Sequence, residues 1–404
     1  MFENLVNQEA GKLLLQDIKN GTMPGAVLFA GPEASGKLTA ALECARILSC
    51  HNKPQGKWIC ECPSCLQHKA LVCNNLLLMG PRDCSLEISA AKKTFLDAYK
   101  NNAQHITGAR YLFIRSIRKL TLRFSGILWV GENNLSKIGN LIEDINESLE
   151  QLDFPRELPS YEDVEKLCSE IEKLCLKLED DFLYDSIPIN QIRNMEEWAH
   201  IKSEEGRKTV IIENADRMLQ NVRNALLKIL EEPPEDCVFI LLSSKRNAIM
   251  ETILSRVRTY NFLPRNSESQ KEVIQRVFHN QDFSGNIYDY LLTYLPVTPA
   301  EIKAQSRIFY QAVSSRQIPN IEDIVKKCGN FKPRIELRIF LSDFAAQMKP
   351  LFYNQQGAEA SAKAMTLLRN CQDNINLFNQ TPKAALEILL RDMSALNQTF
   401  GGIF

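Results

Sequence analysis

Residues 31–37 of the chain read Gly-Pro-Glu-Ala-Ser-Gly-Lys, a pattern typical of a phosphate-binding loop. In such a loop the backbone N–H groups and the start of the next helix surround phosphate oxygens, while the lysine adds positive charge. The following position should carry a hydroxyl that holds magnesium, but it is Leu38. Thr39 lies about 100° farther around a helix, so we expect it to point elsewhere. The candidate loop residues are Gly31, Gly36, Lys37 and Thr39.

A second element of a nucleotide site is an apolar strand that ends in acidic residues, which hold magnesium and polarise the attacking water. The segment Lys208–Met218 reads KTVIIENADRM and matches this description. Glu213 and Asn214 stand where an Asp-Glu pair is expected, and an asparagine is a poor base. Both positions that handle magnesium are therefore altered, which favours a degenerate site over an active one.

Four of the twelve cysteines lie within sixteen residues, at positions 50, 60, 62 and 65. Four thiolates gathered by a short loop are typical of a closed, structural zinc site without an open catalytic position. Cys60 and Cys62 are unusually close in sequence, so Cys73 is an alternative ligand in place of Cys60. Reduced cysteines without a metal remain the other interpretation. The remaining cysteines lack metal spacing and are expected to be buried small apolar residues.

The elements that must position these groups follow from the apolar patterns. The run GAVLFA (Gly25–Ala30) predicts a strand before the glycine loop, and Lys37–Cys50 has helical spacing after it. Residues from about 85 to 183 are expected to be helical, with two apolar stripes separated by a turn that contains two prolines. An antiparallel helical hairpin is the simplest arrangement. The stripes are Leu135, Ile138, Leu141, Ile145, Leu149, Leu152 and Val164, Leu167, Ile171, Leu174, Leu178.

The segment Gly108–Phe124 mixes basic and aromatic residues, and its basic positions are Arg110, Arg115, Arg118, Lys119 and Arg123. Such a mixture can contact DNA. The favoured interpretation is an amphipathic helix whose apolar side packs and whose charges are solvated.

The composition is that of an ordinary folded protein of two to four domains. The 404 residues carry a formal net charge of -1, so any contact with nucleic acid must be local or shared with partners. The N-terminus lacks the features of a signal peptide, and no run of about 18 apolar residues is present. These features predict a cytoplasmic protein with no membrane contact.

The segment Arg223–Phe262, which contains NALLKILEEPP and ILSR, resembles the bacterial replicative clamp-loader family of AAA+ ATPases. The resemblance covers residues 1 to about 80 and 183–265, and is general beyond them. It implies an α/β fold: an AAA+ P-loop domain with a parallel sheet over 1–265, with a zinc module at about 50–73 and a helical insertion at about 85–183. A small helical lid (266–318) and an all-α collar for oligomerisation (319–404) should follow.

Within this family, ATPase subunits of the gamma/tau type keep both magnesium motifs, whereas delta-prime subunits tend to lose them but keep a Ser-Arg pair. This chain keeps Ser255 and Arg256. The resemblance implies that Arg256 is an arginine finger acting in trans on a neighbour's ATP, the alternative being a surface or structural arginine. Ser243 and Ser244 stand at the family's phosphate-sensing position, or simply cap their strand.

The resemblance therefore implies a non-hydrolysing, delta-prime-type subunit of the DNA polymerase III clamp loader. Its expected partners are gamma/tau and delta subunits in a hetero-pentamer, the sliding clamp, and primed DNA reached through the complex. Structural zinc is the expected cofactor, and ATP or ADP should bind weakly or not at all. The alternatives are an active gamma/tau-type ATPase and a zinc-dependent nucleic-acid-binding module. The role of the 85–183 insertion is open.

Overall fold

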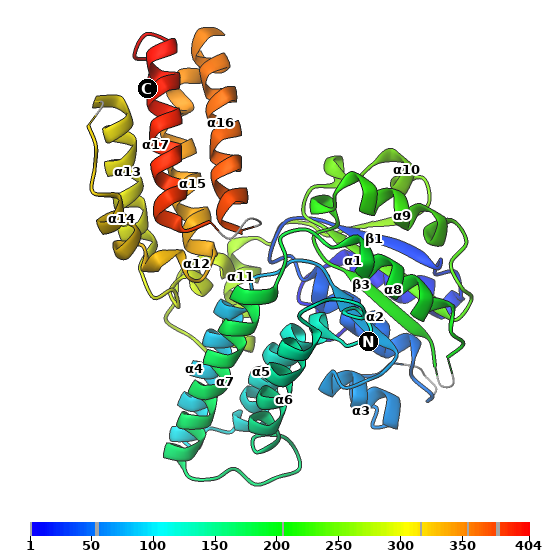
Figure 1. Cartoon of the computed structure of the whole chain (residues 1–404). Helices are drawn as coiled ribbons and strands as arrows, with labels where there is room; N and C mark the ends of the chain where they lie inside the picture. Colours follow the sequence, from blue (N-terminus) through cyan, green and yellow to red (C-terminus); the bar gives the residue numbers. More distant parts are fainter. Residues whose placement is uncertain (1, 53–55, 204–205, 316, 354, 377–379) are drawn as a thin grey trace. The chain divides into compact units, whose positions relative to one another are not determined.

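A computed structural model describes residues 2–404 apart from 53–55, 204–205, 316, 354 and 377–379 (Figure 1). The chain divides into two compact units, Met1–Tyr290 and Leu291–Phe404. This division falls inside the segment expected to form the lid. Within the described residues, no helix is both long and apolar enough to cross a bilayer.

The first unit is organised around one parallel sheet, to which the described residues contribute five strands in the order β2-β3-β4-β1-β5. Every residue of the first four strands is buried, as expected for a parallel sheet covered on both faces. The strands are β1 (Ala26–Ala30), β2 (Leu76–Met79), β3 (Lys208–Ile212), β4 (Cys237–Ser243) and β5 (Arg258–Asn261).

Alternate strand residues enter two separate cores. Val27 and Phe29 of β1 pack with α1 (Glu9–Asn20) and α2 (Lys37–Leu48) on one face. Ala26, Leu28 and Ala30 pack on the other face, against a core that includes the helical insertion and three further helices. Those three are α8 (Ile189–His200), α9 (Gln220–Glu231) and α10 (Glu251–Leu254).

The predicted helical insertion forms four helices, α4 (Ser85–Lys100), α5 (Ile106–Thr121), α6 (Leu135–Glu150) and α7 (Tyr161–Phe182). A short 3-10 helix, η1 (Leu122–Phe124), follows α5. Figure 1 shows these helices running alongside one another, and α7 packs against both α6 and α4. The predicted α6–α7 pair is confirmed, with one shift in its buried stripe. On α7 that stripe is Val164, Cys168, Ile171, Cys175 and Leu178, while Leu167 and Leu174 are half-buried beside it.

The rest of the chain is helical, with α11 (Ser267–Val277) in the first unit and α12 (Ile287–Leu292) at the division. In the second unit α13 packs against α15 and α17, and Phe309 lies edge-on to both Phe340 and Phe344. The helices of this unit are α13 (Pro299–Ser315), α14 (Ile321–Lys327), α15 (Ile335–Gln347), α16 (Gln355–Asn376) and α17 (Pro382–Thr399). The remaining short elements are α3 (Pro63–Ala70), η2 (Ala215–Arg217), η3 (Arg246–Ala248), η4 (Gly329–Phe331) and η5 (Lys349–Tyr353).

Candidate nucleotide and metal sites

The glycine loop lies between the end of β1 and the start of α2, at the carboxyl edge of the sheet. This edge is where open parallel sheets place their ligands. Gly36 has φ +93°, a left-handed conformation that favours glycine. At Gly31 a Cβ atom would lie 2.2 Å from the carbonyl oxygen of Phe262, so a side chain cannot be accommodated there. Both glycines of the motif are thus needed for the loop itself.

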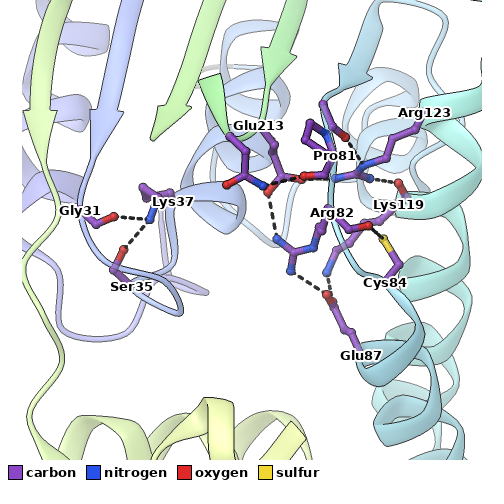
Figure 2. A network of polar contacts seen from close by, with 12 residues as sticks. Gly31, Ser35, Lys37, Pro81, Arg82, Cys84, Glu87, Lys119, Arg123 and Glu213 are labelled. Carbon is purple, nitrogen blue, oxygen red and sulfur yellow. Dashed lines mark hydrogen bonds and ion pairs between the residues drawn. The ribbon is translucent and has the colours of Figure 1, made fainter. Parts of the chain in front are cut away.

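Lys37 is folded back onto its own loop. Its Nζ atom lies 2.5 Å from the carbonyl oxygen of Gly31 (Figure 2). The carbonyl oxygen of Pro32 is at the same distance. Burial lowers the pKa of Lys37 to about 8. Leu38 is buried in the core beneath α2, whereas Thr39 is exposed on the helix surface. No hydroxyl therefore stands at the magnesium position directly after the lysine.

Glu213, directly after β3, is held by two arginines: Arg82, just before α4, and Arg123 in η1, after α5 (Figure 2). Arg82 donates from Nη1 to Glu213 Oε1 over 2.9 Å, and Arg123 donates from Nη2 to Oε2. The Arg123 side chain is fully buried and that of Glu213 is 7% exposed. Both carboxylate oxygens of Glu213 thus accept hydrogen bonds from guanidinium groups.

The network extends beyond this carboxylate to Glu87 on α4. Arg82 donates from Nη2 to Glu87 Oε2 over 2.9 Å, and Lys119 on α5 donates to the other oxygen. Burial opposes ionisation of Glu87, but the charges of Lys119 and Arg82 outweigh it and hold the pKa of this carboxyl well below its usual range. The result is a partly buried series of side chains with alternating charge between the sheet and the insertion.

Asn214 points away from the loop. Its Nδ2 atom donates to the carbonyl oxygen of Pro81 over 2.6 Å, and its backbone has φ +50°, a conformation that asparagine tolerates better than most residues. Gly80 closes this junction, because a Cβ atom there would lie 2.2 Å from the Glu213 carbonyl oxygen. Asn214, which stands where the sequence motif leads us to expect an acidic residue, therefore makes a hydrogen bond that joins two parts of the fold.

The two serines after β4 differ in their surroundings. Ser243 is buried and donates from Oγ to Asp216 Oδ1 over 2.8 Å, while the Ser244 backbone N–H lies 3.3 Å from the same oxygen. Ser243 Oγ also accepts from the Lys245 N–H over 3.0 Å. In the structure these hydrogen bonds satisfy the polar groups at the end of β4.

Arg256 follows α10 at the protein surface. Its guanidinium donates to Glu231 Oε2 over 3.1 Å and to the carbonyl oxygen of Thr252 over 2.9 Å. Glu231 is 60% exposed, and an ion pair so open to solvent contributes about 0–1 kcal/mol. The side chain is therefore held only weakly in its resting position.

The four predicted cysteine ligands lie together next to α3. The sulfur atoms of Cys50, Cys60, Cys62 and Cys65 are all within 4.8 Å of one another, and the Cys50 and Cys60 sulfurs are 3.7 Å apart. A tetrahedral site with zinc–sulfur bonds of about 2.3 Å separates its sulfurs by roughly 3.8 Å. The four sulfurs are thus close enough together to hold a zinc ion after shifts of no more than about 1 Å. Cys73 is outside it, with its sulfur 3.4 Å from His68 Nδ1.

Cys62 begins α3 and is already inclined to ionise. Burial works against the thiolate, but hydrogen bonds from the backbone of His51 and Cys65 and from neighbouring thiols lower the pKa of Cys62 to about 6. Metal binding requires the thiolate, so the backbone around this cysteine is arranged for a ligand. The other cysteines, expected to be small buried apolar residues, are all buried.

The prediction that the charges of segment 108–124 are solvated is wrong. Arg115 and Arg118 donate to the carbonyl oxygens of Lys69 and Ala70, at the end of α3. Unpaired carbonyls at a helix C-terminus favour such cationic donors. The others are engaged as well: Arg110 with the carbonyls of Leu152, Asp153 and Arg156, Arg118 also with Asp153, Lys119 with Glu87 and Arg123 with Glu213.

Three residues of this site were not singled out from the sequence: Arg82, Arg123 as the partner of Glu213, and Asp216. The signal for Asp216 was available, because it lies three residues after Glu213 in the same motif. No signal in the sequence marked the two arginines as partners of Glu213, because Arg82 and Arg123 are separated from it by 131 and 90 residues.

A family model described as DNA polymerase III, delta subunit, matches residues 6–124 and 157–266, which is more than half of the chain. The chain belongs to this family. The resemblance to clamp-loader proteins and the α/β fold with a parallel sheet are thereby confirmed. The family match leaves out residues 125–156, a shorter stretch than the expected insertion at 85–183.

Curated relatives include both subunit types considered above. DNA polymerase III subunit delta' of Bacillus subtilis is 39% identical over 92 residues, which is 23% of this chain and 27% of that protein. The subunit delta' of Pseudomonas aeruginosa is 49% identical over 51 residues, covering 13% and 16%. Subunit tau of Bacillus subtilis is 44% identical over 55 residues, covering 14% and 10%. The matched parts thus span about a quarter or less of each relative.

A solved structure of a gamma subunit-related protein from Thermotoga maritima aligns with 56% of this chain and 90% of its own. Its identity is 17% and its TM-score 0.25, so it adds nothing to the family assignment.

Proposed function

We propose that the chain is a delta-prime-type subunit of the DNA polymerase III clamp loader, which loads the sliding clamp onto primed DNA in the cytoplasm. It would act in a hetero-pentamer with gamma/tau and delta subunits. Family membership and the delta' relatives support this proposal, and the similarity to subunit tau supports a clamp-loader subunit without separating the two types.

The proposal that this subunit does not hydrolyse ATP rests mainly on one observation, the pairing of the Glu213 carboxylate with two arginines. Magnesium in such a site needs protein oxygens. These are normally a hydroxyl on the residue after the lysine and a carboxylate at the end of the strand that corresponds to β3 here. Here Leu38 offers none, and both oxygens of Glu213 accept from Arg82 and Arg123. Asn214 is turned to Pro81. The chain therefore does not run a hydrolytic cycle of its own, and ATP or ADP binds to Gly31, Gly36 and Lys37 weakly or not at all.

In this proposal Arg256 is an arginine finger that acts on the ATP bound to a neighbouring subunit. A guanidinium placed against another subunit's ATP stabilises charge on the transferring phosphoryl group. Its half-buried place at the surface and the solvent-exposed ion pair with Glu231 suit a side chain that must leave its resting contact when a partner docks.

The cysteine group takes a structural zinc ion in this proposal, held by Cys50, Cys60, Cys62 and Cys65. Four thiolates close the coordination shell, so the metal fixes the loop between α2 and α3 and takes no part in hydrolysis.

The test is reconstitution of the clamp loader with Arg256→Ala in this subunit. We expect DNA-stimulated ATP hydrolysis and clamp loading to fall by about tenfold or more, because arginine fingers contribute large factors to phosphoryl transfer. Arg276→Ala is the matched control, since Arg276 is also an arginine at the surface that is paired with a nearby glutamate. Unchanged loading by the Arg256→Ala complex would contradict the assignment.

The gamma/tau-type ATPase is the second candidate, favoured by the similarity to subunit tau. It predicts ATP turnover by the isolated chain that is lost on Lys37→Ala. Measurable turnover of this kind would replace the proposal made here.

A further inference from the structure

A buried arginine stands directly behind the cysteine group. Arg46 lies on α2, is 1% exposed, and donates from Nη1 to the sulfur of Cys65 over 3.3 Å. The same guanidinium donates to the carbonyl oxygens of Lys57 and Gly56 over 3.1 and 2.7 Å, on the loop that carries Cys60. Its remaining N–H groups meet the carboxylate of Glu43, one turn earlier on α2.

This arrangement fits a metal centre better than a neutral cysteine cluster. A divalent ion with four thiolates carries a net charge of -2, and a buried charge needs a paired or hydrogen-bonded partner. Among the described residues, Arg46 is the cationic side chain with a hydrogen bond to one of the four sulfurs. Asn52 contributes a neutral donor to Cys60 over 3.4 Å.

We propose that Arg46 is a positioning residue of the zinc centre: it donates a hydrogen bond to the sulfur of the Cys65 ligand and fixes the loop around Gly56 and Lys57 in the shape that binds the metal. Glu43 holds the guanidinium in place from the other side. This inference rests on the zinc part of the proposed function and is independent of the arginine finger. Partners outside the ligand shell typically change metal affinity by about 10–100-fold.

A purely structural role for Arg46 makes a different prediction. If the guanidinium only ties the loop to α2, its loss lowers the stability of the metal-free and metal-loaded chains equally. If it acts on the thiolate, its loss lowers the metal affinity, and the gain in melting temperature on adding zinc shrinks.

The experiment measures zinc affinity of the full chain by competition with a chromogenic chelator, together with melting temperatures with and without zinc. The variants are Arg46→Met, Arg46→Lys and the double variant Glu43→Leu/Arg46→Met. The double variant removes the buried carboxylate that Arg46→Met leaves unpaired, so a folding defect of the single variant does not end the test. Arg115→Met is the control, because Arg115 binds the same module through the Lys69 carbonyl without touching a sulfur.

We expect Arg46→Met and the double variant to bind zinc about 10–100-fold more weakly than the unaltered chain. Arg46→Lys should be intermediate, since a lysine supplies the charge without the fork of donors. Arg115→Met should keep the affinity. Zinc binding by the double variant as tight as that of the unaltered chain overturns the role of Arg46. An unaltered chain that binds no zinc overturns this inference and the zinc proposal together, while leaving the Arg256 test unaffected.

Discussion

The Arg123 guanidinium has no exposed surface, and the carboxylate that it meets belongs to a different layer of the fold. Removing one partner of a buried ion pair leaves the other charge without compensation, which typically costs about 3–5 kcal/mol of stability. We expect Arg123→Met to lower the free energy of unfolding of the first unit by about 3 kcal/mol, the low end of this range, because Arg82 remains beside Glu213. Urea denaturation followed by circular dichroism measures the change.

The matched control is Arg156→Met. Arg156 also pairs with a glutamate, Glu150, but both side chains are more than half exposed. Its removal should change the free energy of unfolding by less than about 1 kcal/mol. Equal effects of the two substitutions would show that the Arg123–Glu213 pair is no stronger than a surface contact. Adding Glu213→Gln to Arg123→Met should restore part of the loss.

Lys37 gives a residue-level prediction that depends on pH. Burial lowers its pKa to about 8, so the folded chain releases this proton well before an ordinary exposed lysine, whose pKa is about 10.4. Between these values the unfolded chain binds more protons, and the cost of burying the ammonium falls as the pH rises. We expect the rate at which an amine-acylating reagent labels Lys37, followed by mass spectrometry, to rise with a midpoint near pH 8. A midpoint near that of exposed lysines would contradict the buried state.

At the scale of elements, the two sides of α7 differ in burial, and substitutions on them should differ in their effect on stability. Ile171 is fully buried between α4 and α6, whereas Lys173 on the same helix is exposed. Truncating a buried isoleucine typically costs about 2–5 kcal/mol, so Ile171→Ala should destabilise the first unit by that amount. Lys173→Ala should stay within about 0.5 kcal/mol, as surface changes usually do. Similar denaturation midpoints for the two variants would mean that α7 does not pack as described.

Helices and strands with regular apolar spacing were predictable from the sequence, and so was the gathering of the four cysteines, because both depend on short-range patterns. The buried side of α7 was harder to assign. Cys168 and Cys175 are as well placed geometrically as Leu167 and Leu174, and only packing against α4 decides which pair is covered. The pairing of Arg82 and Arg123 with Glu213 was not predictable, since it depends on how the insertion docks onto the sheet.

On the scale of the whole molecule, each of the two units has apolar packing of its own, and the first unit has a core on each face of its sheet. The second unit contains its own aromatic cluster around Phe309, and the division falls between Tyr290 and Leu291. We therefore expect fragments 1–290 and 291–404 to fold separately. Each should show helical circular dichroism and a cooperative thermal transition. A second fragment that melts without a transition would show that its helices depend on the rest of the chain.

The left-handed backbone at Asn214 has an evolutionary consequence. A glutamate restored at this position would have to adopt a conformation that its longer side chain disfavours, and it would give up the hydrogen bond to Pro81. Glu213 would still be neutralised by two arginines that now join the insertion to the sheet. Reversion at Leu38 and Asn214 alone is thus expected to leave the chain without ATP turnover. The same two arginines and Asn214 also join the end of β3 to the segment before α4 and to η1, so a change at any of them disturbs the fold as well as the site.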